Sequence, residues 1–153
     1  MTERSVTHAT FVLEHEYPAP PVRVFAAWAD PAVKTRWFSG AVDPAAAPMK
    51  MDFRVGGTEQ TVSHGDGSVV VYEGLFREIV LAERIVVANW IDVNDQRISV
   101  SQLTAEFRAE GTGTRLVVTE QGAYFDGHDS PGSRAIGIRT QLAALASELE
   151  TGT

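Results

Sequence analysis

The strongest constraint on the fold lies in the last third of the chain, where strand-like sequence gives way to one long amphipathic helix. Residues 114–121 alternate as a strand does, and a polar loop from Tyr124 to Gly132 follows. Beyond this loop, placing residues at about 100° per residue gathers the apolar ones within one arc. They are Ala135, Ile138, Leu142, Leu145, Ala146 and Leu149. Because most of the preceding chain reads as strand, we expect this helix to pack against a sheet.

The rest of the pattern predicts an antiparallel sheet with two short helices near its start. Residues 7–17 read as a first strand, and Pro21 and Pro31 each suit the first position of a short helix, the second one capped by Asp30. Six further strands are expected near residues 49–55, 58–64, 68–79, 84–92, 97–109 and 114–123. The turns between them are of hairpin length, which favours antiparallel pairing, because parallel neighbours need longer crossovers.

Length and composition are typical of one domain that folds without disulfides or a structural metal. A chain of 153 residues buries roughly 68–70% of its unfolded surface, and we expect a single domain over residues 1–153 with a core of about 7–149. The absence of Cys excludes disulfides and thiolate metal sites. The first residues contain no signal peptide and no run long enough to span a membrane, so we expect a cytoplasmic protein. The formal charge of −7 disfavours nucleic acid and anionic lipid as partners.

A set of short motifs, in order along almost the whole chain, resembles a known superfamily. They are Val24-Phe-Ala-Ala-Trp-Ala-Asp-Pro31, Trp37-Phe38, Asp52-Phe-Arg-Val-Gly-Gly57, Tyr72-Glu-Gly74, Glu83-Arg-Ile-Val86 with Trp90, Gly113-Thr-Arg-Leu116, and Gly137. This succession resembles the SRPBCC (START-like) superfamily, in its branch of activators of heat-shock protein 90 ATPase and polyketide cyclase-like proteins. The resemblance implies an α+β helix-grip fold, with a curved antiparallel sheet of about six or seven strands and a long C-terminal helix over its concave face.

A helix laid over a twisted sheet leaves a gap, so either side chains fill it or a cavity remains. We expect an internal cavity that holds an apolar or amphipathic molecule. Trp37 and Trp90 sit in segments expected to border the space beneath the helix. The residues expected to bind the ligand are Trp37, Phe38, Phe76, Trp90, Glu120, Arg134, Ile138, Arg139 and Leu142.

Strand alternation gives Glu120 a special place among these residues. It shares a face with Leu116 and Val118, so it turns toward the helix if they do. A buried carboxylate must be ion-paired, protonated or functional, and Arg134 and Arg139 flank the apolar arc as possible partners. A structural ion pair and a role in ligand anchoring or acid-base chemistry both stay open.

We therefore expect a protein that binds a small hydrophobic or amphipathic molecule, with no cofactor and no metal, and that forms a homodimer if it assembles at all. The loop from Asp126 to Asp129 carries ligand-type side chains, but a short polar loop ahead of a helix reads the same way without a metal. One alternative is a cyclase or hydrolase-like enzyme with Glu120, Tyr124 or His128 as proton-transfer groups. Another is a protein-interaction module that regulates a chaperone or another partner.

Overall fold

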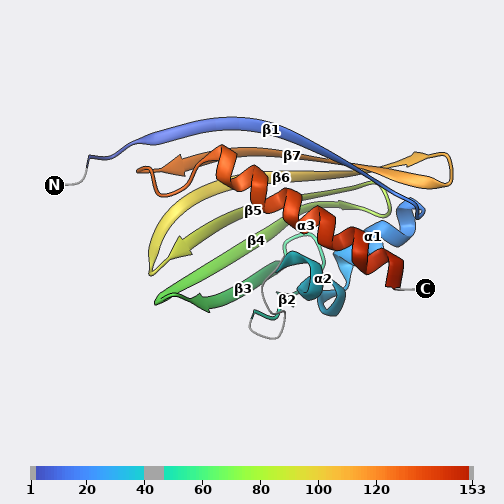
Figure 1. Ribbon diagram of the computed structural model, residues 1–153, viewed down its shortest axis with the longest axis horizontal. Coiled ribbons are helices and arrows are strands. Elements are labelled where there is room, and N and C mark those ends of the chain that lie inside the picture. The colour runs from blue at the N-terminus through green and yellow to red at the C-terminus, as the bar shows by residue number, and fades with distance from the viewer. Residues whose placement is uncertain (1–2, 40–46, 152–153) are drawn as a thin grey trace.

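The computed structural model describes residues 3–39 and 47–151, which form one antiparallel sheet with three helices on its concave side (Figure 1). The seven strands lie in the order β1-β7-β6-β5-β4-β3-β2, so the first strand pairs with the last. The strands are β1 (Val6–Tyr17), β2 (Lys50–Met51), β3 (Thr58–Gly65), β4 (Ser68–Val80), β5 (Arg84–Val93), β6 (Gln96–Glu110) and β7 (Gly113–Phe125). The helices are α1 (Pro21–Ala29), α2 (Pro31–Phe38) and α3 (Pro131–Thr151). The α+β helix-grip fold expected from the sequence is confirmed.

The two short helices begin where the prolines predict. Both have proline at the first helical position, where the missing N–H costs no helical hydrogen bond. The Asp30 carboxylate accepts hydrogen bonds from the backbone N–H groups of Ala32 at 2.9 Å and Val33 at 3.4 Å. It therefore caps α2 and separates it from α1.

Helix α3 buries the predicted apolar arc against the sheet and the short helices. Ala135, Ile138, Leu142, Leu145 and Leu149 are all buried, and Leu145 is fully so. They join a core with aromatic residues from α1, α2 and the concave strands, namely Phe25, Trp28, Trp37, Phe76 and Phe107. The C-terminal part of α3 thus covers a packed core.

The strand expected over residues 49–55 is wrong in extent, because β2 has only two residues. The chain then turns sharply, and the Gly57 N–H donates to the Arg54 carbonyl at 2.8 Å. Gly56 has a φ of +87°, and a Cβ on Gly57 would lie 2.1 Å from the Asp52 carbonyl oxygen. The Gly56-Gly57 pair therefore makes a tight turn that ends the strand early.

Candidate functional site

Strand alternation places a group of polar side chains on the concave face, beneath the helices. Residues that pair across neighbouring strands point to the same face of the sheet, as Glu59 does with Gly74 and Asn89 with Ser101. We call the following residues the inner polar cluster: Lys34, Glu59, Tyr72, Asn89, Ser99, Ser101, Glu120, Tyr124 and Arg134. Seven of the nine are buried, and Tyr72 and Arg134 are half-buried.

One end of the inner polar cluster is a buried ion pair between α2 and β3. Lys34 Nζ donates to Glu59 Oε1 at 2.6 Å, and the two side chains are 2% and 0% exposed. The Tyr72 hydroxyl donates to the other Glu59 oxygen at 2.6 Å. The ammonium also lies 5.1 Å from the ring centre of Trp28 and 5.3 Å from that of Phe38. Hydrogen bonds and aromatic rings thus compensate both charges.

The other end of the inner polar cluster joins Glu120 to Arg134. The Tyr124 hydroxyl donates to Glu120 Oε2 at 2.9 Å. Arg134 Nε lies 3.6 Å from Glu120 Oε1, which is an ion pair but too long for a hydrogen bond. Glu120 is fully buried, and its Oε1 accepts no hydrogen bond from the described residues.

Arg134 ties the start of α3 to the sheet through its two terminal nitrogens. One donates to Asn89 Oδ1 at 2.9 Å, and the other to Ser99 Oγ at 3.2 Å and to Asp129 Oδ2 at 3.4 Å. The guanidinium therefore reaches β5, β6 and the loop before α3 at once, and it is itself only 12% exposed.

Burial governs the titration of this region. It raises the pKa of Glu120 above its ordinary value, and the Arg134 charge and the Tyr124 hydrogen bond oppose only part of that rise. Burial also raises the pKa of Tyr72, with Glu59 adding to the effect, and the charges of Arg134 and Glu120 act on the same hydroxyl. Tyr72 thus lies within electrostatic reach of both ends of the inner polar cluster.

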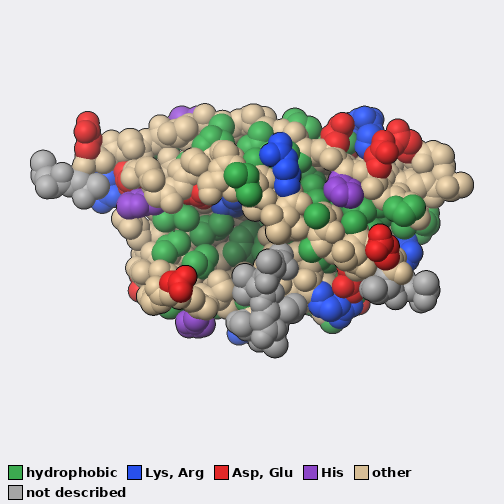
Figure 2. Space-filling view, in the orientation of Figure 1, with side chains coloured by type: hydrophobic (Ala, Val, Ile, Leu, Met, Phe, Trp, Pro, Cys, Tyr) green, Lys and Arg blue, Asp and Glu red, His purple; other side chains and the backbone are tan. Residues whose placement is uncertain are grey.

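Beneath the C-terminal half of α3, the described residues form a packed core in place of the internal cavity expected from the sequence. The hollow nearest the concave face has a volume of about 150 Å³, between the end of α2 and β3, and is lined by Phe38, Ser39, Ala47, Thr61 and Ser63. Figure 2 shows hydrophobic side chains in the part of the concave face that α3 leaves open. Half-buried Val70, Ile91 and Val93 face this side by strand alternation.

Two of the expected ligand-binding residues lie elsewhere. Trp90 was expected to border the space beneath the helix, but its neighbour Asn89 faces inward, so alternation turns Trp90 to the convex face. There its indole N–H donates to Glu73 at 2.9 Å. Arg139 was expected at the cavity rim, but it is exposed, and Arg134 alone of the two pairs with Glu120.

The other expected residues divide between core and open face. Trp37, Phe76 and Leu142 are packed into the core, and Ile138 belongs to the same cluster. Phe38 is half-buried, and its ring centre lies 4.8 Å from that of Tyr72. Of the expected catalytic groups, Glu120 and Tyr124 are hydrogen-bonded to each other, whereas His128 is exposed in the turn between β7 and α3.

Sequence reasoning missed Lys34, Glu59, Asn89 and Ser99. A lysine in a short amphipathic helix is normally solvated, and the sequence alone does not reveal the aromatic rings around Lys34. Glu59 and Asn89 carry a weak signal, since each lies at an inward position of its strand. Their inward position is recognised only once the register is known, and the register depends on pairing across the sheet.

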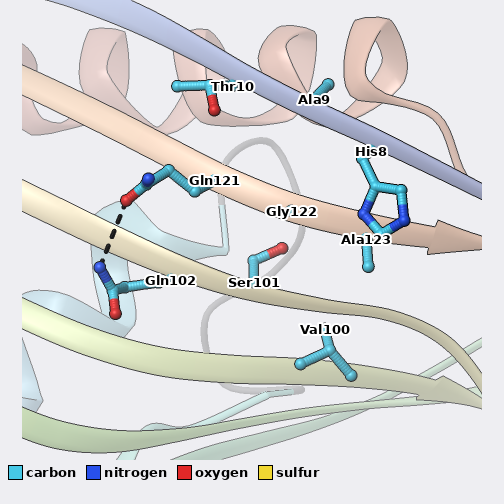
Figure 3. A pocket seen from close by; sticks show the side chains of 9 residues that line it. All are labelled: His8, Ala9, Thr10, Val100, Ser101, Gln102, Gln121, Gly122 and Ala123. Atoms are coloured by element: carbon cyan, nitrogen blue, oxygen red, sulfur yellow. Dashed lines mark hydrogen bonds between the residues drawn. The ribbon is translucent and has the colours of Figure 1, made fainter.

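A broad depression of about 700 Å³ lies on the opposite, convex face, across β1, β7 and β6 (Figure 3). Exposed His8, Thr10 and Val100 line it, and Gln102 donates a hydrogen bond to Gln121 at 3.3 Å. Because its side chains are mostly exposed and uncharged, this surface offers little to fix the orientation of a ligand.

Over residues 3–39 and 47–151, no group of three or more His, Asp or Glu side chains is placed to hold a metal ion. No helix in this part is long and apolar enough to cross a membrane.

The curved sheet, the two short helices after β1 and the long helix over the concave face define a helix-grip domain of the START-like type. The sequence model of the family described as "Activator of Hsp90 ATPase homolog 1-like protein" matches residues 18–150. The chain belongs to this family. No curated protein matches it.

Solved structures share the fold of this chain. Protein Mll3558 from Rhizobium loti is 46% identical, with a TM-score of 0.86 over 94% of this chain and 99% of that one. An uncharacterised protein from Rhizobium leguminosarum is 39% identical, with a TM-score of 0.90 over 97% and 99%. CalU16 from Micromonospora echinospora, at 19% identity and a TM-score of 0.66 over 97% and 86%, shares the fold.

Proposed function

We propose that the protein binds a small amphipathic molecule on the open part of the concave face, beside the N-terminal half of α3. The observation that carries this proposal is the inner polar cluster, which places buried charged groups next to half-buried apolar side chains. Small-molecule sites combine these two features, because apolar surface supplies affinity and a few polar groups fix orientation.

The apolar part of the ligand would contact Phe38, Val70 and Ile91, all half-buried on the concave side. Its polar end would reach Arg134, one of the two half-buried members of the inner polar cluster. The hollow of about 150 Å³ is smaller than typical ligand pockets of about 300–1,000 Å³. Binding therefore uses the open face as well as the hollow. A cytoplasmic location and a homodimer remain predictions from the sequence.

A pair of neighbouring substitutions on β3 tests this location. Ser63 pairs with Val70 on the concave side and lines the hollow, whereas Val62 beside it faces the convex side. Ser63→Phe should fill the hollow and weaken binding of the neutral dye Nile red by about tenfold or more, which is about 1.4 kcal/mol of binding free energy. Val62→Phe should bind like the wild type.

Fluorescence titration measures both variants, with circular dichroism to check the fold. If the wild-type protein does not bind the dye, or if both variants lose affinity equally, the concave site is wrong. Native mass spectrometry of protein purified from its own host would then identify any retained molecule directly.

A second candidate function is acid-base catalysis by Glu120, and one observation favours it. Burial raises the pKa of Glu120, and Oε1 accepts no hydrogen bond from the described residues, so this carboxyl group has a free acceptor atom. Such a reaction requires a ligand that reaches Glu120, so this candidate depends on the first. Turnover of a retained molecule that stops in Glu120→Gln would support it.

A further inference from the structure

Two polar atoms on the concave face are buried without a hydrogen-bond partner among the described residues. They are Glu120 Oε1, on a side chain with no exposed surface, and Ser101 Oγ, on a residue that is 5% exposed. Buried polar groups in proteins are nearly always paired, because an unpaired one loses its hydrogen bonds to water without replacing them. Two such atoms on adjacent strands mark a place that suits a polar group from outside the chain.

Gly122 brings these atoms to one corner of the face. It pairs with Ser101 across β6 and β7, and it is two residues from Glu120 on the same side of β7. A Cβ on Gly122 would lie 2.9 Å from Ser101 Oγ and 2.6 Å from the Tyr124 hydroxyl. The glycine therefore lets both hydroxyl groups approach the same point beside Glu120.

The charges around this corner favour a donor over an anion. Glu120 and Asp129 supply two carboxylates, and among residues 3–39 and 47–151 Arg134 is the cation that pairs with both. The terminal nitrogens of Arg134 already donate to Asn89, Ser99 and Asp129. A ligand carboxylate here would face two negative groups and a guanidinium with existing partners, whereas a ligand O–H or N–H would satisfy Glu120 Oε1.

We infer that the polar end of the bound molecule is a hydrogen-bond donor, a hydroxyl or an amine, that Glu120 selects it over a carboxylate, and that Ser101 forms a second hydrogen bond to it. This inference rests on the proposed function, since it concerns the same concave site. The donor reaches Glu120 past Arg134, the 12% exposed neighbour of that carboxylate. Ser101 Oγ accepts from or donates to the same ligand atom.

Three probes with the same tail and different ends test the inference: octan-1-ol, octylamine and octanoate at neutral pH. Nuclear magnetic resonance titration of labelled protein gives each affinity. The side-chain amide signal of Asn89 and the backbone amide signal of Arg134 show whether the probe reaches this corner, because these residues contact each other on the concave side and do not line the convex depression. The alcohol and the amine should bind roughly tenfold tighter than octanoate, as expected for one hydrogen bond to a charged group. Their addition should shift both amide signals.

Glu120→Gln should reduce the preference for octylamine over octanoate about tenfold, because it removes the charge and keeps the shape. Glu110→Gln, an exposed residue at the end of β6, removes the same charge elsewhere and should leave the preference intact. Ser101→Ala should weaken octan-1-ol binding without changing the preference between the charged probes. This variant tests the contact with the ligand if Glu120→Gln does not fold.

The outcomes separate this inference from the proposed function. If no probe binds, the proposed function fails and the inference fails with it. If the probes bind on the concave face but octanoate is equal or better, or if Glu120→Gln and Glu110→Gln behave alike, the proposed function stands and the inference is wrong. If the probes shift only signals on the convex surface, the proposed concave site and the inference are both wrong.

Discussion

Glu120 and Lys34 are both buried, ionisable and on the concave side, but their neighbours compensate them to different degrees. Lys34 has a carboxylate at 2.6 Å and four aromatic rings within 6.0 Å of its nitrogen. Glu120 has one hydroxyl donor and an arginine nitrogen at 3.6 Å. The charge of Lys34 is thus well accommodated, whereas that of Glu120 carries a remaining desolvation cost.

Glu120→Gln should leave the thermal midpoint unchanged or raise it at neutral pH. The folded state raises the pKa of Glu120 from its ordinary value of 4.5, so the fold binds this proton more tightly than the unfolded chain does. The stability that Glu120 contributes is therefore greatest below that value and is lost as the pH rises through the folded pKa. Glutamine removes this loss, so the variant should gain on the wild type as the pH increases.

Thermal unfolding of both proteins from acid to neutral pH checks this prediction. A clear drop in midpoint for Glu120→Gln at neutral pH would show instead that the ion pair with Arg134 stabilises the fold, and Glu120 would then be a structural residue.

Lys34→Met should destabilise the fold by about 3–5 kcal/mol, because it leaves the Glu59 carboxylate buried without its counter-charge. The double variant Lys34→Met, Glu59→Gln should recover part of this loss, since no uncompensated charge remains. Urea denaturation of the two variants and the wild type measures the difference. Equal stability of the single and double variants would contradict a role for the ion pair in holding α2 to β3.

At the scale of elements, α3 has two functions along its length. Its C-terminal half packs Leu142, Leu145 and Leu149 into the core, while its first turn presents Arg134 to the inner polar cluster. The Tyr17 hydroxyl also donates to the Leu142 carbonyl at 2.9 Å, which fixes the middle of the helix to β1.

Leu142→Ala and Leu149→Ala should therefore both cost about 2–5 kcal/mol, as expected where a large side chain is removed from a packed core. Ile136→Ala, at a position that is 64% exposed on the same helix, should change stability by less than about 0.5 kcal/mol. Denaturant midpoints decide the matter. A much smaller loss at Leu142 than at Leu149 would reveal a cavity wall at the middle of the helix.

The elements themselves could be predicted from the sequence, because each one has a local signal. Proline at the first helical position, the Asp30 cap and the apolar arc of α3 are properties of short segments. The failure at residues 49–55 has a local cause as well, since the turn at Gly56-Gly57 ends the strand after two residues. The length of this strand depends on the close approach of Gly57 to the Asp52 carbonyl, which the sequence does not reveal.

The candidate site was less predictable, because it depends on register and on contacts between distant segments. The inward position of Glu120 followed from alternation within one strand, and its pairing with Arg134 was one of two predicted arrangements. Trp90 was placed on the wrong face because its motif was read without the alternation of its own strand. Lys34 and Glu59 meet across 25 positions of sequence, and no local pattern predicts that pair.

At the scale of the whole molecule, the sheet separates two surfaces that carry different tryptophans. Trp37 lies on the concave side, in edge-to-face contact with Phe38, and Trp90 lies on the convex side. A ligand on the concave face should therefore change the emission of Trp37 and not that of Trp90. Trp90→Phe should keep the emission change caused by octan-1-ol, whereas Trp37→Phe should reduce it. The reverse result would move the ligand to the convex face.

The pairing of β1 with β7 affects how the protein folds during its synthesis on the ribosome. Val6 pairs with Phe125, so the first strand has no partner until nearly the whole chain has been made. At about 5–20 residues per second, β1 waits on the order of ten seconds on the ribosome with its backbone unpaired. Its backbone N–H and C=O groups stay without strand partners during this interval, and the sheet is completed only when β7 emerges.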